Sequence, residues 1–163
     1  MLSKDEGTIN YESLFSLKGK IAIVTGGVGY LGSGISKALA GFGATVIVLG
    51  RTEQTLKDFV DQNQPFHENR FKYFVCDVTD ENNFKEVVEQ TVGTYGTVDI
   101  LINNAYGKQN ESFDELTKEV WNKALDISLT HYFTCSKAIS QIMLEKQSGA
   151  IVNIASIYGF LGT

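Results

Sequence analysis

The stretch KIAIVTGGVGYLGSGISKALAGFG, residues 20–43, decides the fold. Residues 20–25 form a short apolar run rich in β-branched side chains, which predicts a buried strand. Glycines follow directly, and over 31–43 apolar residues recur at helical intervals until Gly43 ends the pattern. These apolar positions are Leu31, Ile35, Ala38, Leu39 and Phe42. The stretch therefore predicts a strand that leads through a glycine-rich turn into a helix.

The rest of the chain repeats this alternation. We expect further strands at 45–50, 71–78, 98–105 and 150–155, and helices at 52–60, from 80–83 through Val92, and at 117–146. Each strand is a nearly continuous apolar run, which is typical of a parallel sheet covered by helices on both faces. Right-handed crossovers then predict a doubly wound α/β fold with strand order 3-2-1-4-5. The ligand crevice is expected at the carboxyl ends of strands 1 and 4, where the winding reverses.

Composition limits the classes of function. A chain of 163 residues with 43% hydrophobic residues and one proline predicts one well-buried domain. The net charge of −5 argues against a nucleic-acid partner, because such binding needs clustered Lys and Arg. The start of the chain carries acidic residues early, and no run of about 18 apolar residues occurs. We therefore expect a soluble, cytoplasmic protein with no membrane partner.

The cysteines and histidines give no sign of a special site. Cys76 and Cys135 are far apart and lie in no CxxC or Cys/His cluster, and His67 and His131 are equally isolated. We therefore predict ordinary thiols and histidines, and no metal site.

The turn TGGVGYLG, residues 25–32, has the context of a phosphate-binding turn. We expect Gly26 to allow the tight turn, Gly29 to let the backbone approach a pyrophosphate, and Gly32 to let the helix pack on the strand. The helix N-terminus would supply N–H donors to the phosphate oxygens. Thr25, Tyr30 and Leu31 are assigned to the same cofactor site. The alternative is a strand-to-helix turn with no ligand.

The end of the second strand favours NADP over NAD. Dinucleotide sites for NAD place a carboxylate there for the ribose 2′-hydroxyl, whereas sites for NADP place a cation for the 2′-phosphate. Here Arg51 and Thr52 follow Gly50, so a guanidinium could pair with a phosphate and no carboxylate would repel it. The alternative is that Arg51 is an ordinary solvated charge.

Four ordered motifs resemble those of the short-chain dehydrogenase/reductase family. They are LKGKIAIVTGG at 17–27, CDVTD at 76–80, DILINNA at 99–105 and IVNIAS at 151–156. The resemblance implies hydride transfer between a nicotinamide cofactor and a small-molecule carbonyl or alcohol substrate. It also implies roles for single residues.

The implied roles cover both the cofactor and the chemistry. Asp77 and Val78 match the positions that hold the adenine ring. Asn103, Asn104 and Ala105 match the motif that stabilises the central sheet and lines the adenine ribose. Ser156 matches the catalytic serine, and Ser128 stands where the family has an asparagine that kinks the long helix and holds a proton-relay water. The serine hydroxyl could bind such a water with fewer hydrogen bonds.

Two further features depart from the family pattern. None of the seven tyrosines is followed four positions later by lysine, the pair that performs the family's acid–base step. Tyr30 stands where the usual middle glycine would be, and the resulting spacing resembles the extended branch with nucleotide-sugar epimerases and dehydratases. Three readings therefore stay open: the cofactor-binding part of an NADP-dependent oxidoreductase, a noncatalytic dinucleotide-binding or interaction module, or a relative of the epimerases.

The resemblance to the family also predicts the domain organisation of the chain. We expect an N-terminal extension at 1–17 and a dinucleotide-binding domain at 18–163 that is incomplete at its C-terminus. Strand 5 would then be an exposed edge and the long helix would keep an uncovered apolar face. Both features favour a homo-oligomer.

Overall fold

A single five-stranded parallel sheet organises the part of the chain that the computed structural model describes, residues 11–66, 68–107, 112–159 and 161. Its strand order is β3-β2-β1-β4-β5, and every neighbouring pair is parallel. The strands are β1 (Ile21–Thr25), β2 (Thr45–Gly50), β3 (Phe71–Val75), β4 (Ile100–Asn103) and β5 (Ala150–Asn153). The predicted doubly wound α/β fold and its strand order are confirmed.

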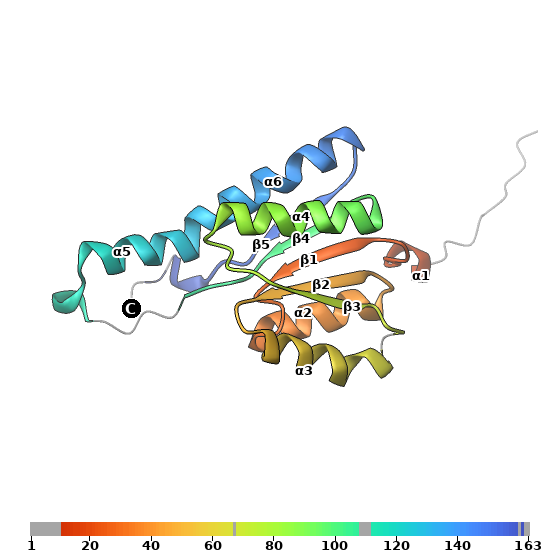
Figure 1. The fold of residues 1–163 in the computed structure, drawn as a ribbon, viewed down its shortest axis with the longest axis horizontal. Helices are drawn as coiled ribbons and strands as arrows, with labels where there is room; N and C mark the ends of the chain where they lie inside the picture. The colour runs from red at the N-terminus through yellow and green to blue at the C-terminus, as the bar shows by residue number, and fades with distance from the viewer. Residues whose placement is uncertain (1–10, 67, 108–111, 160, 162–163) are drawn as a thin grey trace, which may run out of the picture.

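Helices cover both faces of the sheet (Figure 1). α2 (Tyr30–Gly41) and α3 (Glu53–Asn63) pack on one face, and α4 (Glu81–Tyr95) and α6 (His131–Glu145) pack on the other. Successive side chains of a strand point to opposite faces, so every residue of β1 is buried. This arrangement explains why the strands are continuously apolar rather than alternating.

The remaining elements are short. They are α1 (Tyr11–Leu14), η1 (Gln64–Phe66), η2 (Phe113–Glu115) and η4 (Ile157–Gly159). α1 falls inside the predicted extension 1–17, whose last residue donates its backbone N–H to Phe42 O at 2.8 Å. In the described ranges, no helix combines the length and apolarity that a membrane crossing requires.

The predicted strand 150–155 ends at Asn153, and two other predicted strands are also too long. The expected strand 71–78 stops at Val75, because its partner on β2 is Gly50 and β2 ends there. The expected strand 98–105 is paired only over Ile100–Asn103, since the following residues leave the sheet to line the crevice. In both cases the apolar run continues beyond the last residue that a neighbouring strand can pair.

The predicted helix 117–146 is not one regular helix. Thr117 caps it, and its hydroxyl accepts the N–H of Val120 at 3.3 Å. The helix then runs as α5 (Lys118–Leu125), a π-helical segment η3 (Asp126–Thr130) and α6. The chain has no proline or glycine there that would predict the break. The expected helix 52–60 is instead too short, because α3 continues through polar residues to Asn63.

Candidate cofactor site

The turn between β1 and α2 needs glycine at several positions. Gly26 has a φ of +60°, which L side chains rarely adopt. A side chain at Gly32 would collide with Gly26 O, so this glycine lets the first turn of α2 pack on the loop. Gly29 donates its N–H to Gly26 O at 3.1 Å and takes an extended conformation before the helix. The positive φ of Gly26 agrees with a tight turn, whereas Gly32 packs on the turn and on Asn104 rather than on the strand, and the cofactor roles of both residues stay predictions.

The start of α2 can bind an anion. Its first turn carries no acidic residue, and its cap residue Gly29 provides no side-chain hydrogen bond. The first N–H groups of a helix have no partner within the helix and lie at the positive end of its dipole. Since Gly29, Tyr30 and Leu31 line a cavity, these donors lie at its wall.

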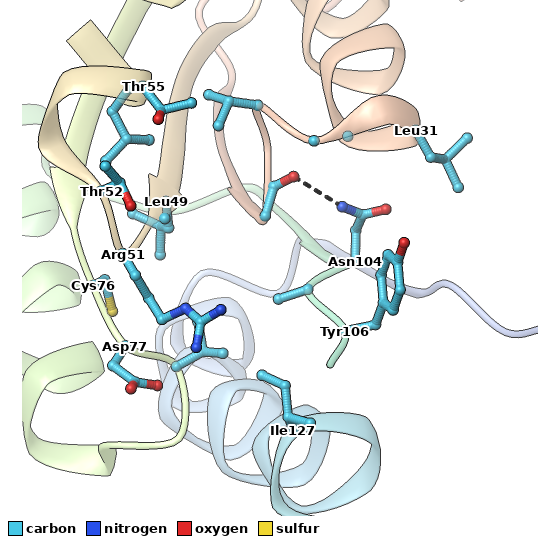
Figure 2. A pocket seen from close by; sticks show the side chains of 18 of the residues that line it. Leu31, Leu49, Arg51, Thr52, Thr55, Cys76, Asp77, Asn104, Tyr106 and Ile127 are labelled. Carbon is cyan, nitrogen blue, oxygen red and sulfur yellow. Dashed lines mark hydrogen bonds between the residues drawn. The ribbon is translucent and has the colours of Figure 1, made fainter. Parts of the chain in front are cut away.

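Hydrogen bonds join the carboxyl ends of β1 and β4 beneath that wall. The buried Thr25 hydroxyl accepts the N–H groups of Asn104 at 2.9 Å and Ala105 at 3.0 Å. The Asn104 side-chain amide donates to Gly26 O at 3.1 Å, the bond drawn from Asn104 in Figure 2. The glycine turn and the loop after β4 therefore form one connected unit at the point where the winding of the sheet reverses.

A cavity of about 340 Å³ opens over this unit. Its lining comes from the turn after β1, the ends of β2, β3 and β4, the first turn of α3 and the π-helical segment. Of the residues predicted for the cofactor site, it includes Gly26, Gly29, Tyr30, Leu31, Gly32, Arg51, Thr52, Asp77, Val78, Asn104 and Ala105. The structure thus brings together predicted residues that lie up to 79 positions apart, as Ala105 and Gly26 do (105 − 26).

Arg51 and Asp77 lie on one side of the cavity, where the Arg51 guanidinium points toward the Asp77 carboxylate (Figure 2). Asp77 Oδ1 accepts from the Thr79 hydroxyl at 2.7 Å and from the Thr79 N–H at 3.0 Å. The hydrogen bonds from the Thr79 hydroxyl and N–H, with a smaller effect from the Arg51 charge, lower the pKa of Asp77 against the opposing effect of burial. Asp77 therefore stays ionised, and the Arg51 guanidinium is exposed to a ligand.

Four predicted site residues lie outside the cavity lining. Thr25 is buried beneath it, in the bonds described above. Asn103 is also buried, and its amide donates to Asn153 Oδ1 at 2.8 Å and Ser136 Oγ at 3.1 Å, so it joins β4 to β5 and α6. Ser156 is exposed in the segment that follows β5, and Ser128 is exposed in η3.

The sequence analysis missed several residues of the cavity wall. They are Val28, Leu49, Leu56, Thr55, Cys76, Tyr106 and Ile127. Thr55 follows Thr52 by one helical turn, which is a signal that spacing could have given. Ile127 reaches the wall from the π-helical segment, which no residue pattern predicted.

Cys76 lies in the cavity wall as an unreactive thiol. Burial raises the pKa of Cys76 to about 12, with further effects from Asp77 and Asp80. Burial also raises the pKa of Cys135 to about 12. Both cysteines are free, and no group of three His, Cys, Asp or Glu side chains that could hold a metal occurs within the described residues.

A model of the short chain dehydrogenase family matches residues 20–163. The chain belongs to this family. The matched region contains all five strands and the whole lining of the cavity.

Individual members of the short-chain dehydrogenase family agree with this match. The chain is 31% identical over 145 residues to an acetoacetyl-CoA reductase of Acinetobacter sp. (strain RA3849), covering 88% of this chain and 58% of that protein. It is 33% identical over 150 residues to the 3-oxoacyl-[acyl-carrier-protein] reductase FabG of Escherichia coli (strain K12), covering 90% and 59%. The crystal structure of gox2181 superposes with a TM-score of 0.85 at 32% identity, covering 91% and 58%.

The chain spans about three fifths of the length of these short-chain dehydrogenase relatives. The shared part contains the sheet and the cavity at its carboxyl edge.

Proposed function

We propose that this chain binds NADP(H) in the 340 Å³ cavity and is the cofactor-binding part of a short-chain oxidoreductase. The observation that carries the proposal is the joint placement of the glycine turn before α2 and of Arg51 in one cavity wall. The residues fit a dinucleotide, because the close packing at Gly32 brings the first turn of α2 into the cavity wall, where the helix N-terminus offers N–H donors to a pyrophosphate. When bound, the nicotinamide supplies or accepts the hydride.

The charge around β2 supports NADP rather than NAD. Arg51 is exposed in the wall with Thr52 and Thr55 beside it, so a 2′-phosphate could receive a bidentate guanidinium pair and hydroxyl hydrogen bonds. Asp77 lies on the same side, but its carboxylate is held by Thr79. We assign Asp77 and Val78 to the adenine end, and Gly26, Gly29 and Gly32 to the pyrophosphate.

Replacing Arg51 tests the cofactor preference. We expect Arg51→Ala to raise the Kd for NADPH about 30-fold, because a charge-assisted phosphate contact contributes about 2 kcal/mol. The Kd for NADH should change less than about 3-fold, since NADH has no 2′-phosphate for the guanidinium to meet. Isothermal titration calorimetry on the parent chain and the variant measures both constants.

Arg51→Asp is the sharper variant. A carboxylate there should repel the phosphate and accept from a ribose hydroxyl, so the preference should move toward NADH. Tighter binding of NADH than of NADPH by the parent chain would refute the assignment of NADP. Failure of the parent chain to bind either dinucleotide would refute the cofactor site altogether.

The proposed chemistry assigns Ser156 to the substrate. Its hydroxyl follows β5, at the same carboxyl edge of the sheet as the cavity, and would hydrogen-bond the carbonyl or alcohol oxygen. Ser128, in the π-helical segment, would hold a water for proton transfer. None of the seven tyrosines of the sequence precedes a lysine by four positions, so we infer that this chain alone lacks the acid–base pair.

Turnover measurements test that inference. With NADPH and a panel of ketones, including 3-oxoacyl thioesters, we expect this chain to give no oxidation of NADPH at 340 nm above the uncatalysed rate. Clear turnover that Ser156→Ala removes would disprove the missing acid–base pair. Dinucleotide binding without turnover also fits the second candidate, a noncatalytic dinucleotide-binding module.

We also propose a homo-oligomer. Large apolar side chains are exposed along α5, η3 and α6, and β5 is an edge of the sheet. The exposed side chains are Trp121, Leu125, Leu129 and Phe133. Sedimentation of the chain as a monomer at all concentrations up to about 100 μM would contradict the proposal.

A further inference from the structure

Tyr106 is an aromatic side chain in the cavity wall that the proposed cofactor site has not used. It follows Ala105 directly after β4, and 76% of its surface is exposed although it lines the cavity. Among the described residues its hydroxyl makes no hydrogen bond. Large exposed aromatic side chains beside a cavity are typical of ligand contacts, because one ring offers apolar faces and a polar tip.

The backbone on both sides of Tyr106 is held in place. The Ala105 N–H bonds to the buried Thr25 hydroxyl at 3.0 Å. Gly107 lies so close to Ile127 that an added Cβ would be 2.5 Å from Ile127 Cγ2. The residue therefore lies between two anchored neighbours, and its ring is presented from a fixed point of the cavity wall.

Tyr106 lies on the side of the cavity away from Arg51. In Figure 2 Arg51 and Asp77 form one side of the cavity, and Tyr106 and Leu31 lie on the other, with Asn104 between them. Leu31 is itself 52% exposed, so this second side is largely apolar. With the adenosine 2′-phosphate at Arg51 and the pyrophosphate at the start of α2, the second nucleotide of the cofactor extends toward this side.

We propose that Tyr106 binds the nicotinamide nucleotide half of the cofactor, with its ring against the ribose or nicotinamide ring. The proposal rests on the proposed function, and it adds a residue that sets how the reactive half is held. With the adenosine half against Arg51 and Asp77, on the other side of the cavity, we expect it to make no contact with Tyr106. Substituting Tyr106 should therefore weaken binding of the whole dinucleotide and leave binding of its adenosine half unchanged.

The test uses a whole ligand and a half ligand. Calorimetry on the full chain gives the Kd for NADPH and for adenosine 2′,5′-bisphosphate, which has the adenosine half alone. We expect Tyr106→Ala to raise the Kd for NADPH about 10-fold and to change the Kd for the bisphosphate less than about 2-fold. Tyr106→Phe keeps the ring, so its NADPH affinity should lie close to that of the parent chain.

Two further variants serve as references. Phe42→Ala removes another exposed aromatic ring, at the far end of α2, and should change neither Kd. Arg51→Ala should weaken both ligands together, because both carry the 2′-phosphate. Thermal unfolding followed by circular dichroism verifies that each variant is folded.

The outcomes are separable. If Tyr106→Ala leaves NADPH affinity unchanged, or weakens both ligands equally, the inference about Tyr106 is overturned while the proposed cofactor site stands. If the parent chain binds neither ligand, the proposed function fails and the inference fails with it. A selective loss for NADPH establishes Tyr106 as a contact of the nicotinamide half.

Discussion

The two ends of the parallel sheet use polar side chains in opposite ways. At the amino end, the buried Asp99 carboxylate accepts the N–H of Ile21 at 2.9 Å and pairs with Lys146 at 2.7 Å and Lys20 at 3.4 Å. Lys146 also donates to Val98 O at 2.9 Å. At the carboxyl end, Arg51 makes no ion pair among the described residues, although charged and donor groups surround the cavity.

This difference distinguishes groups that stabilise the fold from groups that meet a ligand. The amino end satisfies its charges internally, so its residues should affect the free energy of unfolding and leave ligand affinity unchanged. The carboxyl end leaves donors open, so its residues should affect affinity. Substitutions at the two ends test that separation, beginning with the largest expected effect.

The largest effect should come from Asp99→Ala at the amino end. Removing the carboxylate leaves the partly buried Lys146 without its ion-pair partner and takes the acceptor from the Ile21 N–H. We expect the free energy of unfolding to fall by about 3 kcal/mol. Urea unfolding at pH 7 followed by circular dichroism measures this change, while the Kd for NADPH should stay the same for the folded variant.

Asp99→Asn is the matched variant, since it keeps an acceptor for Ile21 and loses the ion pairs. Burial would raise the pKa of Asp99, but hydrogen bonds from Lys146 and Ile21 and the lysine charges lower it overall. A lowered folded-state pKa gives stability that is present above about pH 4 and lost as the pH falls through that pKa. The parent chain should therefore lose its advantage over Asp99→Asn in acid. A weaker NADPH affinity in either variant would contradict the expectation that substitutions at the amino end leave ligand binding unchanged.

An intermediate effect should come from Thr25→Val at the carboxyl end. The substitution keeps the shape of the side chain but removes the acceptor for the N–H groups of Asn104 and Ala105. We expect a loss of about 2 kcal/mol in the free energy of unfolding, because one buried and one partly buried donor lose their acceptor. We also expect weaker NADPH binding, since the loop that carries Tyr106 loses its anchor.

Thr25→Ser restores the hydroxyl and should recover both properties. Unfolding in urea and calorimetry on the same preparations give the two values side by side. If Thr25→Val lowers the free energy of unfolding but leaves the Kd for NADPH unchanged, Thr25 acts as the residues of the amino end do. The proposed difference between the two ends would then be wrong.

The smallest effect should come from pH and His131. This residue is 1% exposed, and both ring nitrogens lack a hydrogen-bond partner among the described residues. Burial lowers the pKa of His131, against the opposing effects of the Asp126 and Ile127 carbonyls and the Asp77 charge. The unfolded chain then binds a proton near pH 6.5 that the folded chain does not, so stability falls as the pH drops below 7.

His131→Gln should reduce the loss of stability between pH 7 and 5. Urea midpoints of the parent chain and the variant, compared across that range, measure the difference. Equal pH dependence in both proteins would show that His131 is not the group that titrates.

Sequence patterns predicted the sheet better than the helices that border the site. β2 lies at the expected 45–50, because its apolar run and its pairing end together. The strand predicted at 71–78 was too long, because β3 ends where its last residue, Val75, pairs with Gly50 at the end of β2. The resemblance places the helix-kinking position of the family at Ser128, inside the π-helical segment, but the residue types alone gave no sign of the break, because an inserted residue in a helix changes hydrogen bonding rather than residue type.

The site was predictable where it depends on backbone geometry. The tight turn expected at Gly26 agrees with its positive φ, whereas the contact of Gly32 with Gly26 O, in place of the expected packing on the strand, is visible only in the folded chain. Tyr106 and Ile127 were missed, because only the folded chain brings the loop after β4 against the π-helical segment. The roles of Ser156 and Ser128 stay predictions.

The π-helical segment also determines how α5 is rotated about the helix axis relative to α6. One extra residue in a helix rotates the turns before it by about 100° relative to the turns after it. Deleting one residue from 128–130 would therefore rotate α5 and Ile127 about the helix axis while α6 kept its place on the sheet. Ile127 would turn away from Gly107 and from the cavity wall. The single inserted residue thus determines which face of the helix borders the cofactor site.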